Sequence, residues 1–395
     1  QQLADAMGIT RKSVSLLVNG KRSLGIHEAV LLSGLFETSV EFWLNLQAAH
    51  DRWAAQKDKE NYSTIRPILE VIAAGGVTDN VLKWKIAMAP RQTKKEAETL
   101  VYRLLDGETR HRLTVPGALV HWSSLPAREK PLGTIVLLHG VASNGSRWEE
   151  FLDTTALRNR WNFIRMDLRG HAASICRGKA RLENWAADVK AVMDEAGVEK
   201  AVIVGHSLGA MIALYFTAHY PAATAGAVYL DPLISEALTS KAKAMRRKTP
   251  MLAVAEAVTR AMNKLGFNRT IVPQDLRAMD AKAREMIAKG GDELKAFIEQ
   301  YSSAKADLQY IHLAPYLRDL LEVGRRTPAP EMIRCPALVI AASSGTFTDP
   351  TAMAAWTKQL ADGEIATVEC AHWPMTECPQ EVSAVIEDWI GRHFG

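Results

Sequence analysis

A five-residue motif in the second half of the chain places strict demands on its surroundings. Gly205-His206-Ser207-Leu208-Gly209 follows an apolar run at 201–204 and opens a helical pattern at 208–219. A chain that turns directly from a strand into a helix needs small residues around the turn, because larger side chains would collide. The motif therefore predicts that Ser207 is a nucleophile, placed where the helix N-terminus favours developing negative charge.

Apolar runs and helical patterns alternate from about residue 112 to the C-terminus. Runs rich in Val, Ile and Leu are typical of buried parallel strands. They lie at 119–122, 134–138, 163–167, 201–204, 227–230, 337–341 and 365–369, and a final helix is expected at 380–394. Between 232 and 334 the strand pattern disappears, which predicts an inserted helical cap. We therefore expect an α/β core at 112–231 and 335–395.

The composition narrows the class of protein. Of the 395 residues, 48% are apolar and 23% are charged, so disorder is excluded as the main state. The net charge of +4 is too small to indicate nucleic-acid binding by the whole chain. The basic run at 241–248 is expected to be a solvated helix face. No apolar run approaches the roughly 18 residues of a membrane span, and no signal-peptide pattern is present.

The cysteines indicate a reducing compartment. Cys176, Cys335, Cys370 and Cys378 form no Cys-x-x-Cys pair, so we expect free thiols and a cytoplasmic protein. Cys370 and Cys378 flank His372, but the spacing of a metal site is absent. We therefore expect no metal.

A serine needs a general base to attack at neutral pH. His372 follows the last apolar run, in Glu369-Cys370-Ala371-His372-Trp373-Pro374, and is the predicted base. His393 lies at the chain end and is expected to face solvent, whereas His206 lies inside the elbow and should point away from Ser207.

Two aspartates are candidates for the carboxylate that orients this base. Asp231 directly follows the run at 227–230. Asp349 precedes Pro350 at the start of a helical pattern, which is the arrangement of a helix N-cap followed by proline. Because that structural role explains Asp349 well, we favour Asp231 and keep Asp349 as the alternative.

Acyl transfer also needs hydrogen-bond donors for an oxyanion. One predicted donor is the backbone N–H of Leu208, the residue after the nucleophile. The other is the N–H of Val141, which follows the run at 134–138 and the turn His139-Gly140.

Together these motifs resemble the α/β-hydrolase family over about 280 residues, from 112 to 395. The segment Asp167-Leu168-Arg169-Gly170-His171-Ala172-Ala173-Ser174 resembles the family's D-x-R-G-H-G-x-S loop, with Ala172 in place of glycine. The resemblance implies a mostly parallel eight-stranded sheet and a helical cap over Ser207. A serine in the elbow argues against epoxide hydrolases and dehalogenases, which resemble this fold but attack through aspartate.

The sequence departs from the commonest family pattern at the position of the carboxylate that orients the histidine. The usual position follows the run at 337–341, where Ala342-Ser343-Ser344-Gly345 contains no carboxylate. The departure leaves Asp231 and Asp349 both open, but it does not change the class.

The first sixty residues have a different character. A short helix is expected at 2–8 and a second at 10–18, separated by a three-residue turn. Basic and small polar side chains can reach phosphates and base edges from such a position. The candidate DNA contacts are Arg11, Lys12, Ser13, Lys21 and Arg22.

This pattern resembles a Cro/repressor helix-turn-helix, and the run at 41–47 resembles the antitoxin branch of that class. The match begins at the second helix of the module, so we expect a partial module at 1–60 and a helical linker at 61–111. Residues 1–60 carry seven basic and seven acidic side chains, which makes DNA binding by residues 10–22 a secondary expectation.

The leading hypothesis is a serine hydrolase that cleaves a carboxylic ester, or a related thioester or lactone, of a small molecule. It would use a Ser-His-Asp triad and an acyl-enzyme, without a cofactor. The alternative is a DNA-binding regulator whose hydrolase-like domain senses a ligand. The same triad could also support perhydrolysis or C–C bond hydrolysis, which fold-level analogy does not separate. The sequence predicts no particular oligomeric state.

Overall fold

The computed structural model describes residues 9–18, 23–36, 39–40, 43–44, 47, 103–176, 180–247, 249–264, 275–289, 303–309 and 311–395. The chain divides into two compact units. One contains residues 1–96 and 261–268, and the other contains 97–260 and 269–395. The units are described separately below.

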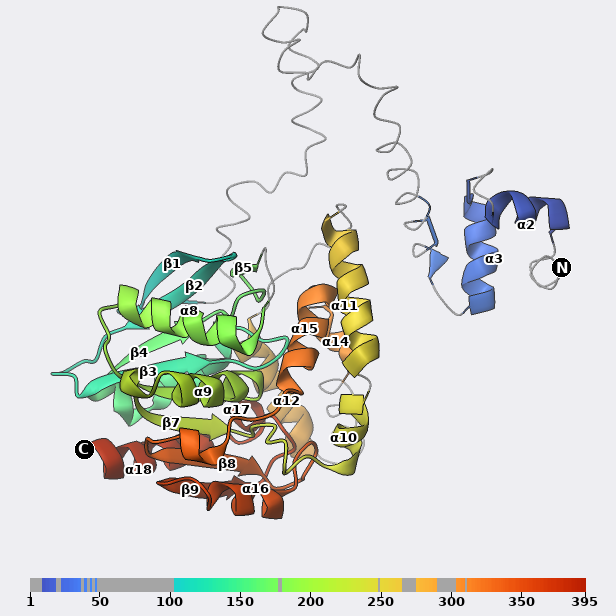
Figure 1. The fold of residues 1–395 in the computed structure, drawn as a ribbon. Coiled ribbons are helices and arrows are strands. Elements are labelled where there is room, and N and C mark those ends of the chain that lie inside the picture. The colour runs from blue at the N-terminus through green and yellow to red at the C-terminus, as the bar shows by residue number, and fades with distance from the viewer. Residues whose placement is uncertain are drawn as a thin grey trace, which may run out of the picture. The chain divides into compact units, whose positions relative to one another are not determined.

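A mostly parallel sheet forms the centre of the larger unit (Figure 1). Eight of the nine strands found in its described residues follow the order β1-β2-β4-β3-β6-β7-β8-β9, and β5 pairs with β2. The first three strands of that order pair antiparallel, and the pairs from β4 to β9 are parallel. The strands are β1 (Thr109–Val115), β2 (Ala118–Leu125), β3 (Gly133–Leu138), β4 (Trp161–Met166), β5 (Ile175–Cys176), β6 (Ala201–His206), β7 (Thr224–Leu230), β8 (Ala337–Ala342) and β9 (Gly363–Val368).

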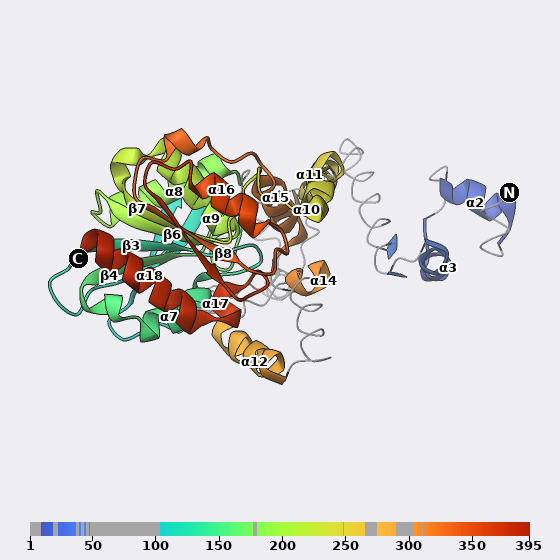
Figure 2. The same ribbon diagram turned by 90° about the horizontal axis from the view of Figure 1, so that it is seen from below.

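Helices cover both faces of this sheet (Figure 2). One face packs on α8 (Leu182–Glu195), α9 (Leu208–His219) and α16 (Pro350–Thr357). The other packs on α7 (Glu149–Thr154) and α18 (Pro379–Phe394). Side chains of β3 alternate between the two cores, with Val136 and Leu138 in the first and Ile135 and Leu137 in the second. A strand buried on both faces reads as a continuous apolar run, which is why the sequence predicted it.

The predicted α/β fold with a mostly parallel sheet is confirmed, and each predicted run overlaps an observed strand, although residues 167 and 369 lie just beyond β4 and β9. The sheet begins earlier than expected, however. Most of the predicted helical linker at 61–111 lies outside the described residues, but its last residues, from Thr109 onward, belong to β1. β1 pairs with β2 across a tight turn in which Gly117 adopts a φ of 75°. As a half-exposed edge strand rich in Arg and Thr, it carries no apolar run for sequence analysis to detect.

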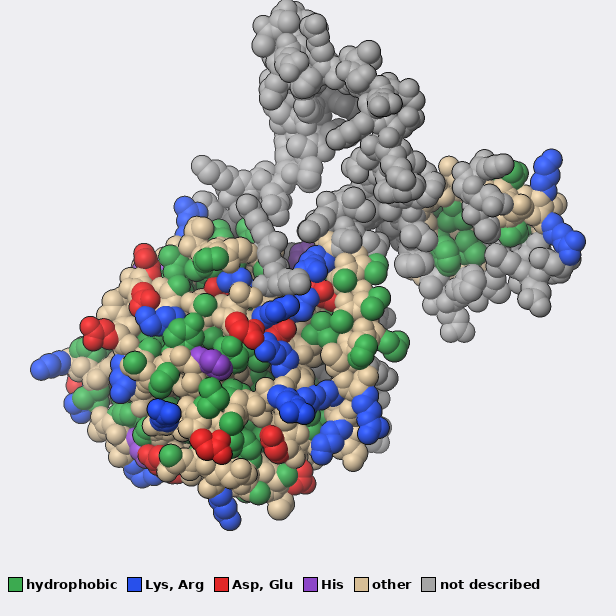
Figure 3. All heavy atoms as spheres, viewed as in Figure 1, with side chains coloured by type: hydrophobic (Ala, Val, Ile, Leu, Met, Phe, Trp, Pro, Cys, Tyr) green, Lys and Arg blue, Asp and Glu red, His purple; other side chains and the backbone are tan. Residues whose placement is uncertain are grey.

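The described residues between 232 and 334 contain helices and no named strand. These helices are α10 (Ser240–Arg247), α11 (Thr249–Lys264), α12 (Leu276–Lys289), α14 (Ala304–Asp307) and α15 (Leu313–Val323). Lys243 and Arg247 are exposed in α10, and Lys and Arg side chains gather over this part of the surface (Figure 3). No described helix is both long and apolar enough to cross a bilayer.

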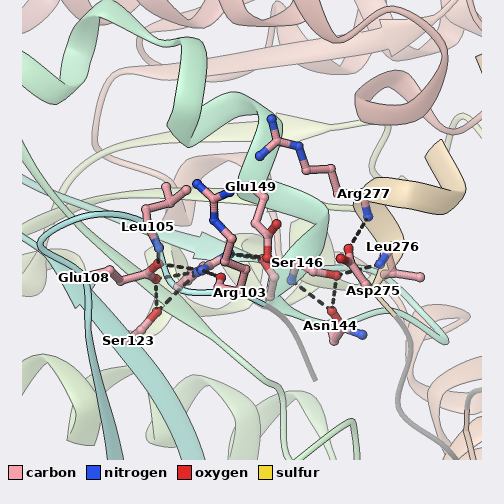
Figure 4. Close-up of polar contacts among 12 residues, drawn as sticks. Arg103, Leu105, Glu108, Ser123, Asn144, Ser146, Glu149, Asp275, Leu276 and Arg277 are labelled. Carbon is pink, nitrogen blue, oxygen red and sulfur yellow. Dashed lines mark hydrogen bonds and ion pairs between the residues drawn. The ribbon is translucent and has the colours of Figure 1, made fainter. Parts of the chain in front are cut away.

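A buried ionic network joins β4, α7 and Glu108, the residue that directly precedes β1 (Figure 4). The Arg165 guanidinium makes two hydrogen bonds of 2.6 Å with the Glu108 carboxylate. The Glu149 carboxyl lies 3.6 Å from the same guanidinium, and its Oε1 has no hydrogen-bond partner. Burial raises the pKa of Glu149 to about 7, although Arg165 opposes the shift. The Arg165 guanidinium therefore lies between two buried carboxyl groups, those of Glu108 and Glu149.

The described part of the smaller unit contains α2 (Arg11–Val18) and α3 (Ile26–Phe36). The Ser13 N–H donates to Thr10 Oγ1 at 3.1 Å, which caps the first turn of α2. The backbone N–H of Leu24 donates to Gln47 Oε1 at 2.7 Å and ties the start of α3 to the segment beyond it. The helix expected at 2–8 lies outside the described residues.

Candidate active site

The elbow around Ser207 joins β6 directly to α9. Ser207 adopts a φ of 54° and a ψ of −111°, a conformation that costs a non-glycine residue on the order of 1–3 kcal/mol. A side chain at Gly205 would collide with the backbone of Gly209, and one at Gly209 would collide with the backbone of Leu138. The flanking glycines are therefore required for this close packing of strand, turn and helix.

Three side chains form a buried hydrogen-bonded chain at the carboxyl ends of the strands. Ser207 Oγ lies 3.0 Å from His372 Nε2, and His372 Nδ1 lies 2.5 Å from Asp231 Oδ2. A carboxylate can only accept a hydrogen bond, so Nδ1 carries the proton and donates it to Asp231. Nε2 is then free to accept the hydroxyl proton of Ser207. This arrangement can activate a serine for attack on a carbonyl carbon.

The two candidate acids have different surroundings. Asp231 follows β7 with a φ of 42°, and its Oδ1 accepts from Thr348 Oγ1 at 3.3 Å and from the Ala342 N–H at 3.4 Å. Asp349 is exposed, and its side chain accepts from the Ala352 N–H at 2.7 Å as the N-cap of α16. The structure therefore brings Asp231, and not Asp349, to His372.

The backbone at His372 is held by Glu377 and His206, whose roles the sequence did not reveal. The Glu377 carboxylate accepts from three consecutive N–H groups, those of Ala371 at 2.9 Å, His372 at 3.2 Å and Trp373 at 2.9 Å. His206 Nε2 donates to the carbonyl oxygen of His372 at 2.9 Å, and burial lowers the pKa of His206 to about 3. Because their partners are backbone groups, no spacing of side chains in the sequence pointed to either residue.

The loop after β3 approaches the elbow through its backbone. A methyl group on Gly140 would lie 3.3 Å from Ser207 Cβ, so this backbone runs beside the serine. His139 fixes the turn, since its Nδ1 donates to the Gly140 carbonyl at 2.8 Å and its Nε2 accepts from the Leu168 N–H at 3.0 Å. Burial holds the pKa of His139 well below its usual value, so the ring is neutral. Val141 follows this turn, and Leu208 is the first residue of α9.

The loop after β4 is held by side chains of α8 and α15. Arg169 forms a bidentate ion pair with Asp188 of α8. His171 Nε2 lies 2.8 Å from Asp319 Oδ2 of α15, and this carboxylate raises the pKa of His171 against the opposing effect of burial. Ala172 has a φ of 43°, the left-handed conformation that glycine adopts most easily. This is the position at which the sequence departs from the family's glycine.

The four cysteines are free, and Cys335 and Cys370 are buried. Within the described ranges, no group of three or more His, Cys, Asp or Glu side chains has the arrangement of a metal site.

The candidate DNA contacts are only partly described. Arg11 and Lys12 are exposed in the first turn of α2, and the Ser13 hydroxyl lies 2.9 Å from Thr10 Oγ1. Lys21 and Arg22 lie outside the described residues.

Comparison with known proteins gives matches to two kinds of protein. A family model for the alpha/beta hydrolase fold matches residues 133–378. A 2-hydroxy-6-oxononadienedioate/2-hydroxy-6-oxononatrienedioate hydrolase of Paraburkholderia phymatum is 24% identical over 323 residues, which cover 77% of this chain and 100% of that protein. A thermophilic esterase from Thermogutta terrifontis has a similar structure, with a TM-score of 0.52 and 21% identity over 73% of this chain and 100% of that one.

A second match concerns a short part of the chain. An uncharacterized HTH-type transcriptional regulator of Escherichia coli K12, YbaQ, is 39% identical over 75 residues. The match covers 18% of this chain and 66% of the regulator.

Proposed function

Because the chain belongs to the α/β-hydrolase fold family, we propose that it is a serine hydrolase that cleaves a carboxylic ester, or a related thioester or lactone. The observation that carries the proposal is the buried chain from Ser207 Oγ through His372 to Asp231. A strained serine at a helix N-terminus, paired with an oriented imidazole, is the arrangement that acyl transfer requires.

In the proposed reaction, Ser207 Oγ attacks the substrate carbonyl while His372 Nε2 takes its proton. The resulting imidazolium donates that proton to the leaving alcohol, and an acyl-enzyme remains. A water molecule then attacks the acyl carbon while His372 takes its proton. The bond to Ser207 Oγ breaks, the proton returns to this oxygen, and the carboxylic acid is released. Asp231 holds the imidazole in the required tautomer and stabilises its charged form.

The proposed oxyanion donors are the backbone N–H groups of Val141 and Leu208. Leu208 begins α9, where unpaired N–H groups and the helix dipole favour negative charge. Val141 follows the turn that runs beside Ser207. Such a donor contributes about 10²–10³ in rate in comparable sites.

The proposal has a direct test. A panel of p-nitrophenyl esters of increasing acyl length would measure turnover, and a fluorophosphonate probe would report the nucleophile. We expect Ser207→Ala to lower turnover by about 10⁶-fold, because the triad acts as a unit. It should also abolish labelling while leaving the thermal unfolding transition in place. Equal labelling of the parent and the variant would contradict the assignment.

C–C bond hydrolysis is a closely related alternative, because fold-level analogy does not separate it from ester cleavage. The Paraburkholderia hydrolase is named for 2-hydroxy-6-oxononadienedioate and 2-hydroxy-6-oxononatrienedioate, and we add these compounds to the panel. Activity on these substrates without ester turnover would support the alternative.

A second function of another class, DNA binding, is proposed for the N-terminal residues. The observation that favours it is the exposed pair Arg11 and Lys12 in the first turn of α2, together with the match to an HTH-type regulator. In this proposal a partial helix-turn-helix module at 1–60 accompanies the hydrolase core and its cap at 232–334.

A further inference from the structure

Cap helix α12 is fastened to the core by a buried carboxylate. Asp280 lies in α12 and is 3% exposed. Its Oδ1 accepts from the Arg147 guanidinium, and from Thr376 Oγ1 at 2.9 Å. Arg147 also donates to Thr376 Oγ1, so the three side chains form a closed triangle. The helix is further attached at its first residue, where the Leu276 N–H donates to Ser146 Oγ at 2.9 Å (Figure 4).

The two core partners of Asp280 belong to the segments that carry the proposed chemistry. Arg147 lies in η2 (Gly145–Trp148), which follows the loop that contains the proposed oxyanion donor Val141. Thr376 lies in α17 (Pro374–Glu377), the turn that follows His372. Arg284, one turn beyond Asp280 in α12, donates to the Thr376 carbonyl at 3.2 Å. Helix α12 of the cap therefore contacts both the turn that follows His372 and the segment that follows the Val141 loop, and it does so through Asp280.

We propose that Asp280 is a positioning residue, through which cap helix α12 fixes the His372 turn relative to the Val141 loop. The inference rests on the proposed function. Asp280 is not expected to contact substrate; it acts through Thr376 and Arg147. The His372 imidazole and the Val141 N–H must both act at the carbonyl group of the substrate. A shift of about 1 Å in either segment would misplace one of them, which can lower the rate about 100-fold.

Electrostatics supports the need for a carboxylate at this position. Arg147 is nearly buried, and Asp280 is the described acid that forms an ion pair with it. Burial raises the pKa of Asp280, while Arg147 and Thr376 stabilise its ionised form. If Asp280 were neutral, the guanidinium would remain buried without its counter-charge, and it would seek other acceptors.

The test compares Asp280→Asn with a matched control on the same helix. Arg277 attaches α12 to Asp153 on the core surface, and its side chain is 36% exposed. We expect Asp280→Asn to lower kcat for p-nitrophenyl acetate about 10–100-fold with little change in KM. Arg277→Gln should leave both values within about twofold. An equal effect of the two variants, or a change in KM alone, would overturn the inference, because it would show a general role in cap attachment.

Hydrogen exchange supplies a readout that does not depend on turnover. In Asp280→Asn, the amides of 371–377 and 141–147 should exchange faster than in the parent, whereas Arg277→Gln should leave them unchanged. Unchanged exchange in Asp280→Asn would reject positioning even if kcat fell. If the parent itself hydrolyses no ester, the proposed function fails, and the exchange result alone decides whether Asp280 holds the two segments.

A double variant separates positioning from stability. Replacing Arg147 and Asp280 together, as Arg147→Met with Asp280→Leu, removes the buried charge pair without leaving either charge alone. We expect the thermal midpoint to recover toward that of the parent while kcat remains low. Recovery of both would show that Asp280 only stabilises the fold.

Discussion

At the scale of single residues, Asp231 and Asp349 test whether a carboxylate is used for chemistry or for helix capping. Asp231→Asn should lower kcat by about 10⁴-fold, because the amide no longer holds His372 in the tautomer that accepts a proton. Asp349→Ala should leave kcat nearly unchanged and destabilise the fold by about 1 kcal/mol through loss of the α16 N-cap. Steady-state kinetics and thermal unfolding of both variants measure these effects.

The opposite result would reassign the acid. If kcat collapses in Asp349→Ala and survives in Asp231→Asn, the 2.5 Å contact between His372 and Asp231 is not the catalytic one.

Glu377 is predicted to matter through the backbone that it holds. A glutamine keeps one acceptor oxygen for three N–H groups and places an amide donor where the second oxygen lies. Glu377→Gln should therefore destabilise the fold by about 1–3 kcal/mol and lower kcat roughly tenfold, since His372 moves with its turn. Glu381→Gln, an exposed neighbour in the first turn of α18, should change neither value.

Residues whose partners are side chains at familiar spacings could be predicted from the sequence. Ser207 and His372 follow strands at places where the turn and the chain order reveal them. Glu377 and His206 could not be predicted, because each binds a backbone group and leaves no pattern of paired side chains. The sequence favoured Asp231 as the acid only because a helix N-cap already explained the presence of Asp349.

At the scale of elements, the start of α7 should make stability depend on pH. Burial raises the pKa of Glu149 from 4.5 to about 7. Between pH 4.5 and about pH 7, Glu149 holds a proton in the folded state that it has released in the unfolded state. The free energy of unfolding therefore falls as the pH rises through this range. Glu149→Gln stays neutral and should remove that fall, which amounts to up to about 3 kcal/mol. Chemical denaturation at pH 5 and pH 8 measures the difference.

An exposed glutamate provides the control for this pH effect. Glu195→Gln, in the last turn of α8, should keep the pH dependence of the parent. If Glu149→Gln and the parent lose stability equally between pH 5 and pH 8, another buried group is responsible.

Helices and strands were predictable from the sequence where burial requires a pattern of apolar residues. The central strands are apolar on both faces, so their positions could be predicted within a few residues. β1 was missed because its pairing is set by the hairpin with β2 and not by an apolar pattern. The helical character of the described residues between 232 and 334 was also predictable from the lack of strand runs.

At the scale of the whole molecule, the contact between cap helix α12 and the core was beyond prediction. Arg147 and Asp280 are 133 residues apart and belong to no common motif. His372 and Asp231 are 141 residues apart, but the chain order of the motifs had already favoured them as partners. The amphipathic pattern of a cap helix shows that it has a buried face, but it does not show which part of the core that face contacts. The pairing of cap and core therefore required the structure.

Because the net charge of the whole chain is only +4, we expect any attraction to DNA to come from local basic helices, of which α2 and α10 are the two candidates. We expect weak, sequence-independent binding, on the order of 10⁻⁴–10⁻⁶ M at physiological salt, carried by Arg11 and Lys12 of α2. Replacing both with glutamine should reduce the slope of log K against log salt by about one unit for each lost phosphate contact. The matched control is Lys243→Gln with Arg247→Gln in α10, which removes the same charge from the cap and should leave the slope unchanged. If the salt slope falls only in the α10 variant, DNA contacts the cap and not the N-terminal residues. The regulator hypothesis would then lose its electrostatic support.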